Sequence, residues 1–206
     1  GGGIIELNAA PGLRMHLQPS YGKARHVGET IIDYMFDKND DARIPIVAIT
    51  GTNGKTTTAR LIGNLFERNN QRAGVACTDG VFVNGQCIDT GDCSGPKSAR
   101  NILFHPDVDA AVLETARGGM LREGLGFDRC NVAIVTNIGM GDHLGMAYVN
   151  TAEELAAVKR IIVQNVASSG YAVLNAADLL VVDMAEHCPG SVIFFARDNL
   201  HHPVLA

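Results

Sequence analysis

One short segment constrains this chain more than any other, because it joins an apolar run to an amphipathic one through a turn with two glycines. The turn reads Gly51-Thr52-Asn53-Gly54-Lys55-Thr56-Thr57. The run before it, residues 46–49, is Ile-Val-Ala-Ile and is typical of a buried strand. The apolar side of the helix expected after it is traced by Ala59, Leu61, Ile62, Leu65 and Phe66. Strand, turn and helix thus follow in the order of a phosphate-binding loop.

The residue types of this turn suit a nucleoside triphosphate. Glycines let backbone N–H groups approach phosphate oxygens, and the N-terminus of the following helix adds a positive partial charge. Lys55 supplies a full positive charge, and the hydroxyl of Thr56 can bind a magnesium ion. The pattern G-x-x-x-x-G-K-[ST] is not met, since Ile49 occupies its first glycine position, and the alternative is a strand-to-helix turn with an incidental lysine. The coincidence of all these features favours the nucleotide site.

The chain after residue 43 alternates short runs rich in Val and Ile with helical segments. This pattern predicts an α/β fold, in which a mostly parallel sheet carries helices on both faces and its strands are buried on both sides. The predicted strands are residues 44–49, 74–77, 110–113, 132–135, 171–174 and 192–195. Helices are predicted to begin at Lys55, near Pro96, at Thr151 and near Asp178. Asn84-Gly85 indicates a hairpin between residues 81–83 and 87–88.

The polar stretch of residues 37–43 is interpreted as a linker that sets residues 1–36 apart from the rest. Before it come a short predicted strand, a Pro-Gly turn and one amphipathic segment. The strand is marked by Ile4, Ile5 and Leu7. This is too little sequence to bury a core, so we do not expect residues 1–36 to form a domain alone.

Composition excludes several classes of protein. Of the 206 residues 46% are hydrophobic, which is enough for a full core, and the net charge of −5 without any Lys/Arg cluster argues against a nucleic-acid partner. No apolar run reaches the roughly 18–20 residues of a membrane span, and no signal-peptide pattern is present, so we expect a cytoplasmic protein. The five cysteines include no CxxC pair, which predicts reduced thiols.

Two further groups are expected at the same edge of the sheet as the loop. Glu114 directly follows the apolar strand 110–113, and ligands of open α/β sheets bind beyond the carboxyl ends of strands. Glu114 is therefore a candidate magnesium ligand, with a surface acid as the alternative. A second strand leads into Asp142 and His143, which are candidates for a second metal or for orienting the nucleotide, unless the pair is an ordinary turn.

A lysine falls on the apolar side of the next predicted helix. That helix begins with the capping box Thr151-x-x-Glu154, and its apolar stripe contains Leu155, Val158, Ile162 and Val166. Lys159 lies within this stripe. A buried lysine must extend to solvent, find an acidic partner or be modified.

The order of these motifs resembles the central ATPase domain of the Mur ligases. The matching residues are Thr50 to Thr57, Glu114, Thr136-Asn137-Ile138, Asp142-His143 and Lys159. The resemblance implies that ATP binds on residues 51–57 with Asn137, and that Mg2+ is held by Thr56, Glu114 and His143. It also implies catalytic roles for Lys55, His143 and Lys159, the last often as a carbamate that reaches the metal.

Residues 92–100 and 114–124 most resemble those members of the family that join an ATP-grasp module to a Mur-like module. Residues 5–12 resemble the last motif of an ATP-grasp domain, in which Glu6 and Asn8 would bind Mg2+. The resemblance therefore assigns residues 1–36 to the end of an ATP-grasp domain. It assigns residues 44–206 to a Mur central domain that is incomplete at its C-terminus, and the chain alone is expected to be inactive.

The implied reaction is amide formation through an acyl phosphate, joining arginine to the β-carboxylate of an aspartyl residue in an acidic peptide polymer. Arg117 and Arg122, in a glycine-rich loop, could hold this polymer or simply be solvated. A folate polyglutamate ligase, a nucleotide-binding module without chemistry and a P-loop kinase or GTPase are the alternatives. The GTPase is disfavoured because no Asn-Lys-x-Asp motif is present. Homo-oligomer formation through the full-length enzyme is left open.

Overall fold

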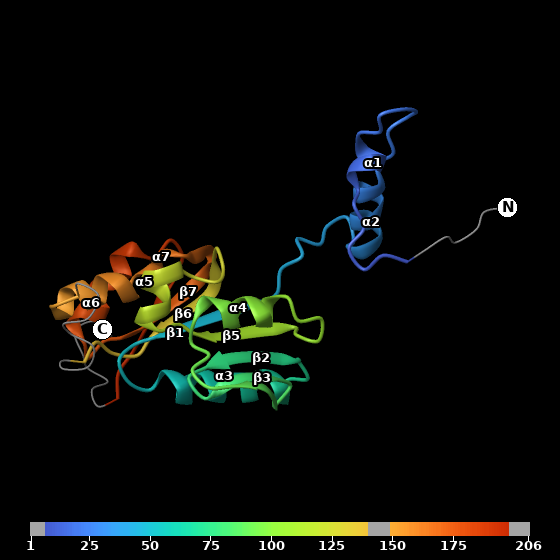
Figure 1. Ribbon diagram of the computed structural model, residues 1–206. Coiled ribbons are helices and arrows are strands. Elements are labelled where there is room, and N and C mark those ends of the chain that lie inside the picture. The colour runs from blue at the N-terminus through green and yellow to red at the C-terminus, as the bar shows by residue number, and fades with distance from the viewer. Residues whose placement is uncertain (1–6, 140–148, 198–206) are drawn as a thin grey trace. The chain divides into compact units, whose positions relative to one another are not determined.

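The computed structural model of the protein describes residues 7–139 and 149–197. The chain divides into two units, Gly1–Arg43 and Ile44–Ala206, and the division falls at the end of the polar stretch interpreted as a linker. Figure 1 shows both units with their helices and strands labelled. None of the described helices is long and apolar enough to cross a membrane.

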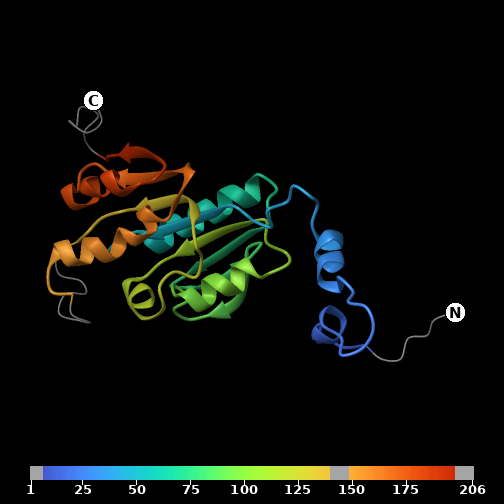
Figure 2. The ribbon, with the colours of Figure 1, turned by 90° about the horizontal axis from the view of Figure 1, so that it is seen from above.

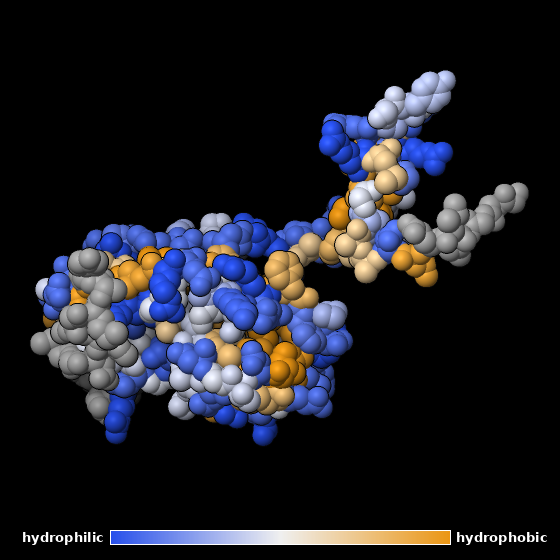
Figure 3. Space-filling model, viewed as in Figure 1, coloured by the Kyte–Doolittle hydropathy of each residue, from blue (hydrophilic) through white to orange (hydrophobic). Residues whose placement is uncertain are grey.

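The described part of the first unit, from residue 7 on, contains two short helices, α1 (Arg14–Leu17) and α2 (Val27–Met35), and neither has a buried residue. Several of their hydrophobic side chains are exposed, and hydrophobic patches are visible on this unit in Figure 3. Of the strand predicted here, Ile4 and Ile5 lie outside the described residues, while Leu7 is exposed and belongs to no strand.

Within the described part of the second unit, eight strands form one sheet in the order β4-β3-β2-β5-β1-β6-β7-β8. Their bounds are β1 (Ile46–Thr50), β2 (Ala73–Cys77), β3 (Gly80–Val83), β4 (Gln86–Thr90), β5 (Ala110–Glu114), β6 (Cys130–Val135), β7 (Val166–Asn175) and β8 (Ser191–Phe195). The pairs from β2 through β5, β1, β6 and β7 to β8 are parallel, while β2, β3 and β4 pair antiparallel. The mostly parallel sheet and the hairpin at Asn84-Gly85 are therefore confirmed.

Helices cover both faces of the sheet, as predicted. They are α3 (Lys55–Arg68), α4 (Pro96–Leu103), α5 (Arg117–Glu123), α6 (Ala152–Lys159), α7 (Ile161–Gln164) and α8 (Leu179–Val182), followed by the 3-10 helix η1 (Asp183–His187). Figure 2 shows α3 and α4 on opposite sides of β1. Alternate residues of β1 explain this: Val47 and Ile49 pack on the α3 side, whereas Ile46 and Ala48 face the core under the other helices.

The local signals at helix starts are confirmed. α3 begins at Lys55 and α4 at Pro96, where proline stands in the first turn and loses no helical hydrogen bond. Thr151 caps α6 through the predicted capping box with Glu154. Asp178 caps α8 by accepting hydrogen bonds from backbone N–H groups. These starts depend on neighbours in sequence and could be predicted without the fold.

Burial of the strands was predicted too widely. β1, β2 and β5 are buried along their whole length, whereas β8, which was also predicted to be buried, alternates between exposed and half-buried. Every residue of β4, for which only the hairpin was predicted, is exposed. β4 and β8 are the two edges of the sheet. An edge strand has a neighbour on one side only, so its side chains are less covered than those of β1.

The helix predictions need three corrections. Leu61 and Leu65 of α3 are 62% and 64% exposed, because the sheet covers only the side of α3 that carries Ala59 and Gly63. The stripe that continues to Val166 is not on one helix, since α6 ends at Lys159 and Val166 begins β7. The glycine-rich stretch after β5, expected as a loop, forms α5.

Candidate functional site

The turn between β1 and α3 is a phosphate-type loop whose two glycines have backbone angles that other residues rarely adopt. Gly51 has φ +145° and Gly54 has φ +84°. A Cβ on Gly51 would overlap the hydroxyl of Thr136, because the loop lies directly against the end of β6. Gly54 has open space around it and caps α3, which begins at Lys55. Both glycines are thus required by conformation, and Gly51 by close approach as well.

The residues after β6 hold this loop through several hydrogen bonds. Asn137 Oδ1 accepts a bond of 3.0 Å from Asn53 N, and Asn137 Nδ2 donates one of 3.1 Å to Asn53 O. Thr136 Oγ1 donates to the same carbonyl at 2.6 Å, and Gly139 N donates to Thr52 Oγ1 at 2.8 Å. Asn137, predicted to bind nucleotide, therefore lies at the loop, and in this structure its amide shapes the loop itself.

Glu114 is brought next to the start of α3, because β5 is the parallel neighbour of β1. Its side chain is 1% exposed, which rules out the alternative of a surface acid. Thr56 Oγ1 donates to Glu114 Oε2 at 2.9 Å, and Lys55 Nζ lies 3.9 Å from Glu114 Oε1. Lys55 Nζ also donates to Thr52 O at 3.0 Å. The structure thus brings three of the predicted residues together at one point.

The donor set at this point fits magnesium. Mg2+ prefers oxygen ligands at about 2.0–2.1 Å in an octahedron, so two adjacent ligands are about 3 Å apart. The 2.9 Å between Thr56 Oγ1 and Glu114 Oε2 agrees with that spacing. Among the described residues no group of three His, Cys, Asp or Glu could hold a metal, so the remaining ligands would be the nucleotide, water or residues elsewhere.

Lys159 is buried on α6, with 2% of its surface exposed. Its Nζ donates a hydrogen bond of 2.7 Å to the carbonyl of Gly51. Burial, together with the charges of Lys55 and Arg117, lowers the pKa of Lys159 to about 8, although the charge of Glu114 acts in the opposite direction. The side chain does not extend to solvent, and its hydrogen-bond partner is a backbone carbonyl of the loop.

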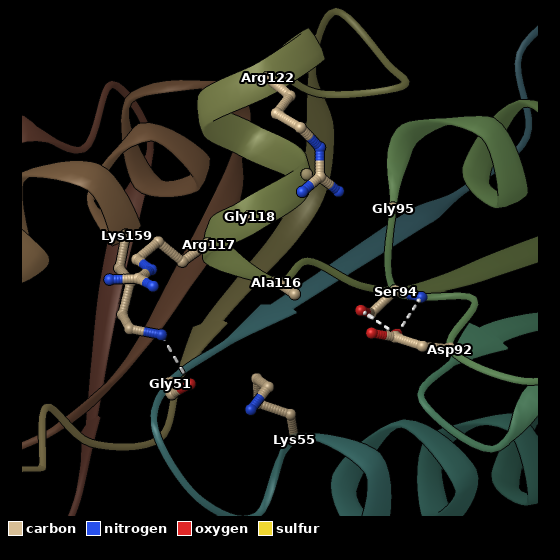
Figure 4. A pocket seen from close by; sticks show the side chains of 11 residues that line it. Gly51, Lys55, Asp92, Ser94, Gly95, Ala116, Arg117, Gly118, Arg122 and Lys159 are labelled. Atoms are coloured by element: carbon tan, nitrogen blue, oxygen red, sulfur yellow. Dashed lines mark hydrogen bonds between the residues drawn. The ribbon is translucent and has the colours of Figure 1, made fainter. Parts of the chain in front are cut away.

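A cavity of about 290 Å³ opens beside the loop, and Figure 4 shows the side chains around it. Its lining residues are Gly51, Lys55, Asp92, Ser94, Gly95, Ala116, Arg117, Gly118, Gly119, Arg122 and Lys159. Arg117 and Arg122 both come from α5, and Arg117 is 9% exposed. Ser94 Oγ donates to Asp92 Oδ1 on the opposite wall. Four cationic side chains line this cavity, which suits a ligand with carboxylate or phosphate groups.

The remaining predicted metal-site residues lie outside the described part of the second unit. Glu6, Asp142 and His143 lie outside the described residues. Asn8 is an exposed residue of the other unit. Sequence reasoning also missed a contact: Thr78, directly after β2, hydrogen-bonds Glu114. The rule that led to Glu114, a polar residue after a buried strand, applies equally to Thr78.

The parallel sheet, the phosphate-type loop after β1 and the carboxylate at the end of β5 define a P-loop nucleotide-binding protein of the α/β class. Comparison with known protein families identifies the family within this class. The Mur ligase middle domain matches residues 49–204, and the chain belongs to the Mur ligase family.

Individual relatives agree with this assignment. A cyanophycin synthetase of Synechocystis sp. is 48% identical over 204 residues, which is 99% of this chain and 23% of that protein. The chain therefore spans about a quarter of this relative. Among solved structures, a UDP-N-acetylmuramoyl-L-alanyl-D-glutamate–2,6-diaminopimelate ligase covers 77% of this chain at 26% identity, with a TM-score of 0.61 over 33% of its own length. A folylpolyglutamate synthase/dihydrofolate synthase shares the fold at 18% identity and TM-score 0.52, over 77% of this chain and 44% of its own.

Proposed function

We propose that this chain is the ATP-binding core of a ligase that joins the α-amine of arginine to the β-carboxylate of aspartyl residues in an acidic peptide polymer, the reaction of cyanophycin synthetases. The observation that carries the proposal is the 48% identity to such a synthetase over 99% of the chain. A folate ligase shares the fold at 18% identity and is the second candidate. We infer further that residues 1–36 are the end of an ATP-grasp domain, with Glu6 and Asn8 as its Mg2+ ligands.

The proposed reaction has two steps. ATP phosphorylates the β-carboxylate to give an acyl phosphate and ADP; the α-amine of arginine then attacks the acyl carbon, phosphate leaves and the amine loses a proton. Catalysis of this kind depends on positioning and on neutralising charge. Lys55, which lies in the loop at the N-terminus of α3, neutralises negative charge on the phosphates. Mg2+, when bound by Thr56, Glu114 and His143, would add positive charge at the phosphates.

The cavity next to Lys55 is the proposed place of the acidic substrate. Arg117 and Arg122 line it from α5, and the cavity reaches Gly51 in the loop. Carboxylates bind well to guanidinium groups because two parallel N–H donors match two oxygens. Of the two arginines, Arg117 is the stronger candidate for a substrate ligand, because it is buried and solvent therefore screens its charge poorly.

The decisive assay follows ATP consumption and amide formation together in the complete natural protein. With an aspartate–arginine primer and free arginine, we expect ADP, phosphate and arginine-extended polymer in equal amounts. Replacing the primer with a folate and arginine with glutamate should give no product. Phosphate release without any amide would contradict the ligase proposal, and extension of the folate would favour the second candidate.

Lys159 is proposed to carry a carbamate in the working enzyme. Only the neutral amine reacts with carbon dioxide. Because the pKa of Lys159 is about 8, roughly a quarter of it is neutral near pH 7.5, against about a thousandth for an ordinary lysine. The carbamate should therefore form increasingly as pH rises from 7 to 9 and be lost as the pH falls below 7. Carbon-13 NMR with labelled bicarbonate measures this.

The control for this experiment is Lys159→Met, which removes the amine but keeps an unbranched side chain on the buried side of α6. The carbamate signal should be absent from this variant. A high-resolution crystal structure at pH 8 that shows an unmodified ammonium on Lys159, with Mg2+ and nucleotide bound, would contradict the proposal.

A further inference from the structure

The cavity beside the loop carries charges of both signs. Among the described residues that line it, the cations are Lys55, Arg117, Arg122 and Lys159, whereas Asp92 is the one acid. Within the described part of the chain, Asp92 forms no ion pair with any of these four side chains. The positive and negative groups that face the cavity are therefore kept apart.

The Asp92 carboxylate is fixed by one buried residue. Ser94, which is 5% exposed, donates to Asp92 Oδ1 both from its Oγ and from its backbone N, the latter at 3.1 Å. Both bonds go to the same oxygen, and from the described residues Oδ2 accepts none. Figure 4 shows Oδ2 on the cavity side of Asp92. An ionised carboxylate accepts bonds at both oxygens, so Oδ2 is a preoriented acceptor that faces the cavity.

The two walls of the cavity are joined directly, which fixes the spacing of their charges. Ala116 N, at the start of α5, donates to Ser94 O at 3.1 Å. α5 also packs closely on the segment after Ser94, because a Cβ on Gly119 would lie 2.9 Å from Pro96 Cδ and 3.1 Å from Gly95 Cα. A ligand that binds both walls must therefore match a fixed separation of charges, and this makes the cavity selective.

The polymer of the proposed reaction also carries both charges. Each arginine that has been added keeps its guanidinium, and the aspartyl residue at the reacting end keeps its β-carboxylate. The cavity volume of about 290 Å³ lies just below the usual range of about 300–1,000 Å³ for ligand sites, so the cavity holds only the end of a polymer. A guanidinium placed among four cations is repelled unless a carboxylate neutralises it. Asp92 is the group that can do so.

We propose that Asp92 is a specificity-determining residue, whose Oδ2 binds the guanidinium of the arginine next to the reacting end of the polymer. This inference rests on the proposed function, because that function supplies the polymer. Arg117 and Arg122 select an end with a free carboxylate. Asp92 adds selection for a neighbouring residue that already carries arginine. The cavity thus prefers a polymer whose preceding residue is complete over bare polyaspartate.

The test uses two primers that differ in one group. Both end in an aspartyl residue with a free β-carboxylate, and the residue next to it carries either arginine or citrulline, whose ureido group has nearly the shape of guanidinium but no charge. The KM for each primer is measured from arginine incorporation by the complete natural protein, with ATP and free arginine saturating. Because Asp92 is exposed, solvent screens the ion pair, and citrulline should raise the primer KM by about 3–5-fold with little change in kcat.

The variant that isolates this effect is Asp92→Asn, which removes the charge but keeps Oδ1 as the acceptor for Ser94. Its KM for the arginine primer should rise by about 3–5-fold, and the citrulline primer should be no worse. Its KM for free arginine should stay near that of wild type. Asp89→Asn is the matched control, because Asp89 carries the same charge and is also exposed but does not line the cavity. This control should discriminate between the two primers as wild type does.

Equal KM values for the two primers in the wild-type protein would overturn the inference without any variant. Undiminished discrimination in Asp92→Asn would overturn it too, as would a loss of discrimination in Asp89→Asn. A raised KM for free arginine in place of the primer would assign Asp92 to the incoming amino acid and also overturn it. All four results are compatible with the proposed function. If the wild-type protein adds arginine to neither primer, the proposed function fails, and the inference fails with it.

Discussion

Lys55→Ala should abolish arginine incorporation while leaving the fold intact. The Lys55 ammonium lies beside the loop, where it donates to Thr52 O and stands 3.9 Å from Glu114. Removing one preorganised positive group from a site where charge develops typically lowers a rate by about 10²–10³-fold. Because Lys55 is the only full positive charge within the loop, we expect a loss at the upper end of that range. Radiolabelled arginine incorporated into the polymer measures it.

Two controls make the Lys55→Ala result specific. Lys97→Ala removes an exposed lysine from the first turn of α4 and should change neither incorporation nor nucleotide binding. The thermal unfolding midpoint of Lys55→Ala should stay near wild type, since the side chain contributes no apolar contact to the core. A normal rate of incorporation in Lys55→Ala would contradict the assignment of the loop to ATP.

Gly51→Ala should disrupt the loop more severely than any other single methyl group added to it. An alanine there would be strained at φ +145°, and its Cβ would overlap the Thr136 hydroxyl and lie close to Asn137 N. Thr136 and Asn137 hold Asn53, and the Gly51 carbonyl accepts the bond from Lys159. We expect the free energy of unfolding to fall by about 2–4 kcal/mol, the sum of backbone strain and overpacking. Nucleotide binding should be lost.

Gly54→Ala is the matched comparison, because Gly54 has φ +84° in the same loop but no atom within 4 Å of its added Cβ. It should lower the free energy of unfolding without nucleotide by about 1–2 kcal/mol, the cost of a left-handed backbone alone. Urea unfolding of the two variants measures the difference. Equal losses in Gly51→Ala and Gly54→Ala would show that the contact with Thr136 does not matter.

Much of the fold could be predicted because its signals are local. The strands around Val47 and Val112 are short apolar runs, and Thr151 and Asp178 cap helices through bonds to residues two or three positions away. Capping and strand burial depend on residues close in sequence or on plain hydrophobicity. These features identified the class of sheet and the edge at which a site would form.

The errors have one common cause, which is that the partner of a segment is absent from its sequence. Leu61 and Leu65 match the apolar pattern of a buried face, but nothing in the described structure covers that side of α3. The stretch after Ala116 contains Gly118 and Gly119, which lower helix propensity, yet it forms α5 with Met120 packed into the core. Tertiary packing overrode the local preference in both cases.

By itself the sequence determined the phosphate-type loop, the alternation of strands and helices that defines the fold class, and the chemical identity of Lys55, Thr56, Glu114 and Lys159. Only the tertiary structure decided what these groups contact. Glu114 meets Thr56 because β5 pairs with β1, and it meets Thr78 because β2 pairs with β5 on the other side. Lys159 reaches the Gly51 carbonyl from 108 positions away. Strand order is set by the free energy of the whole sheet, which no local pattern reports.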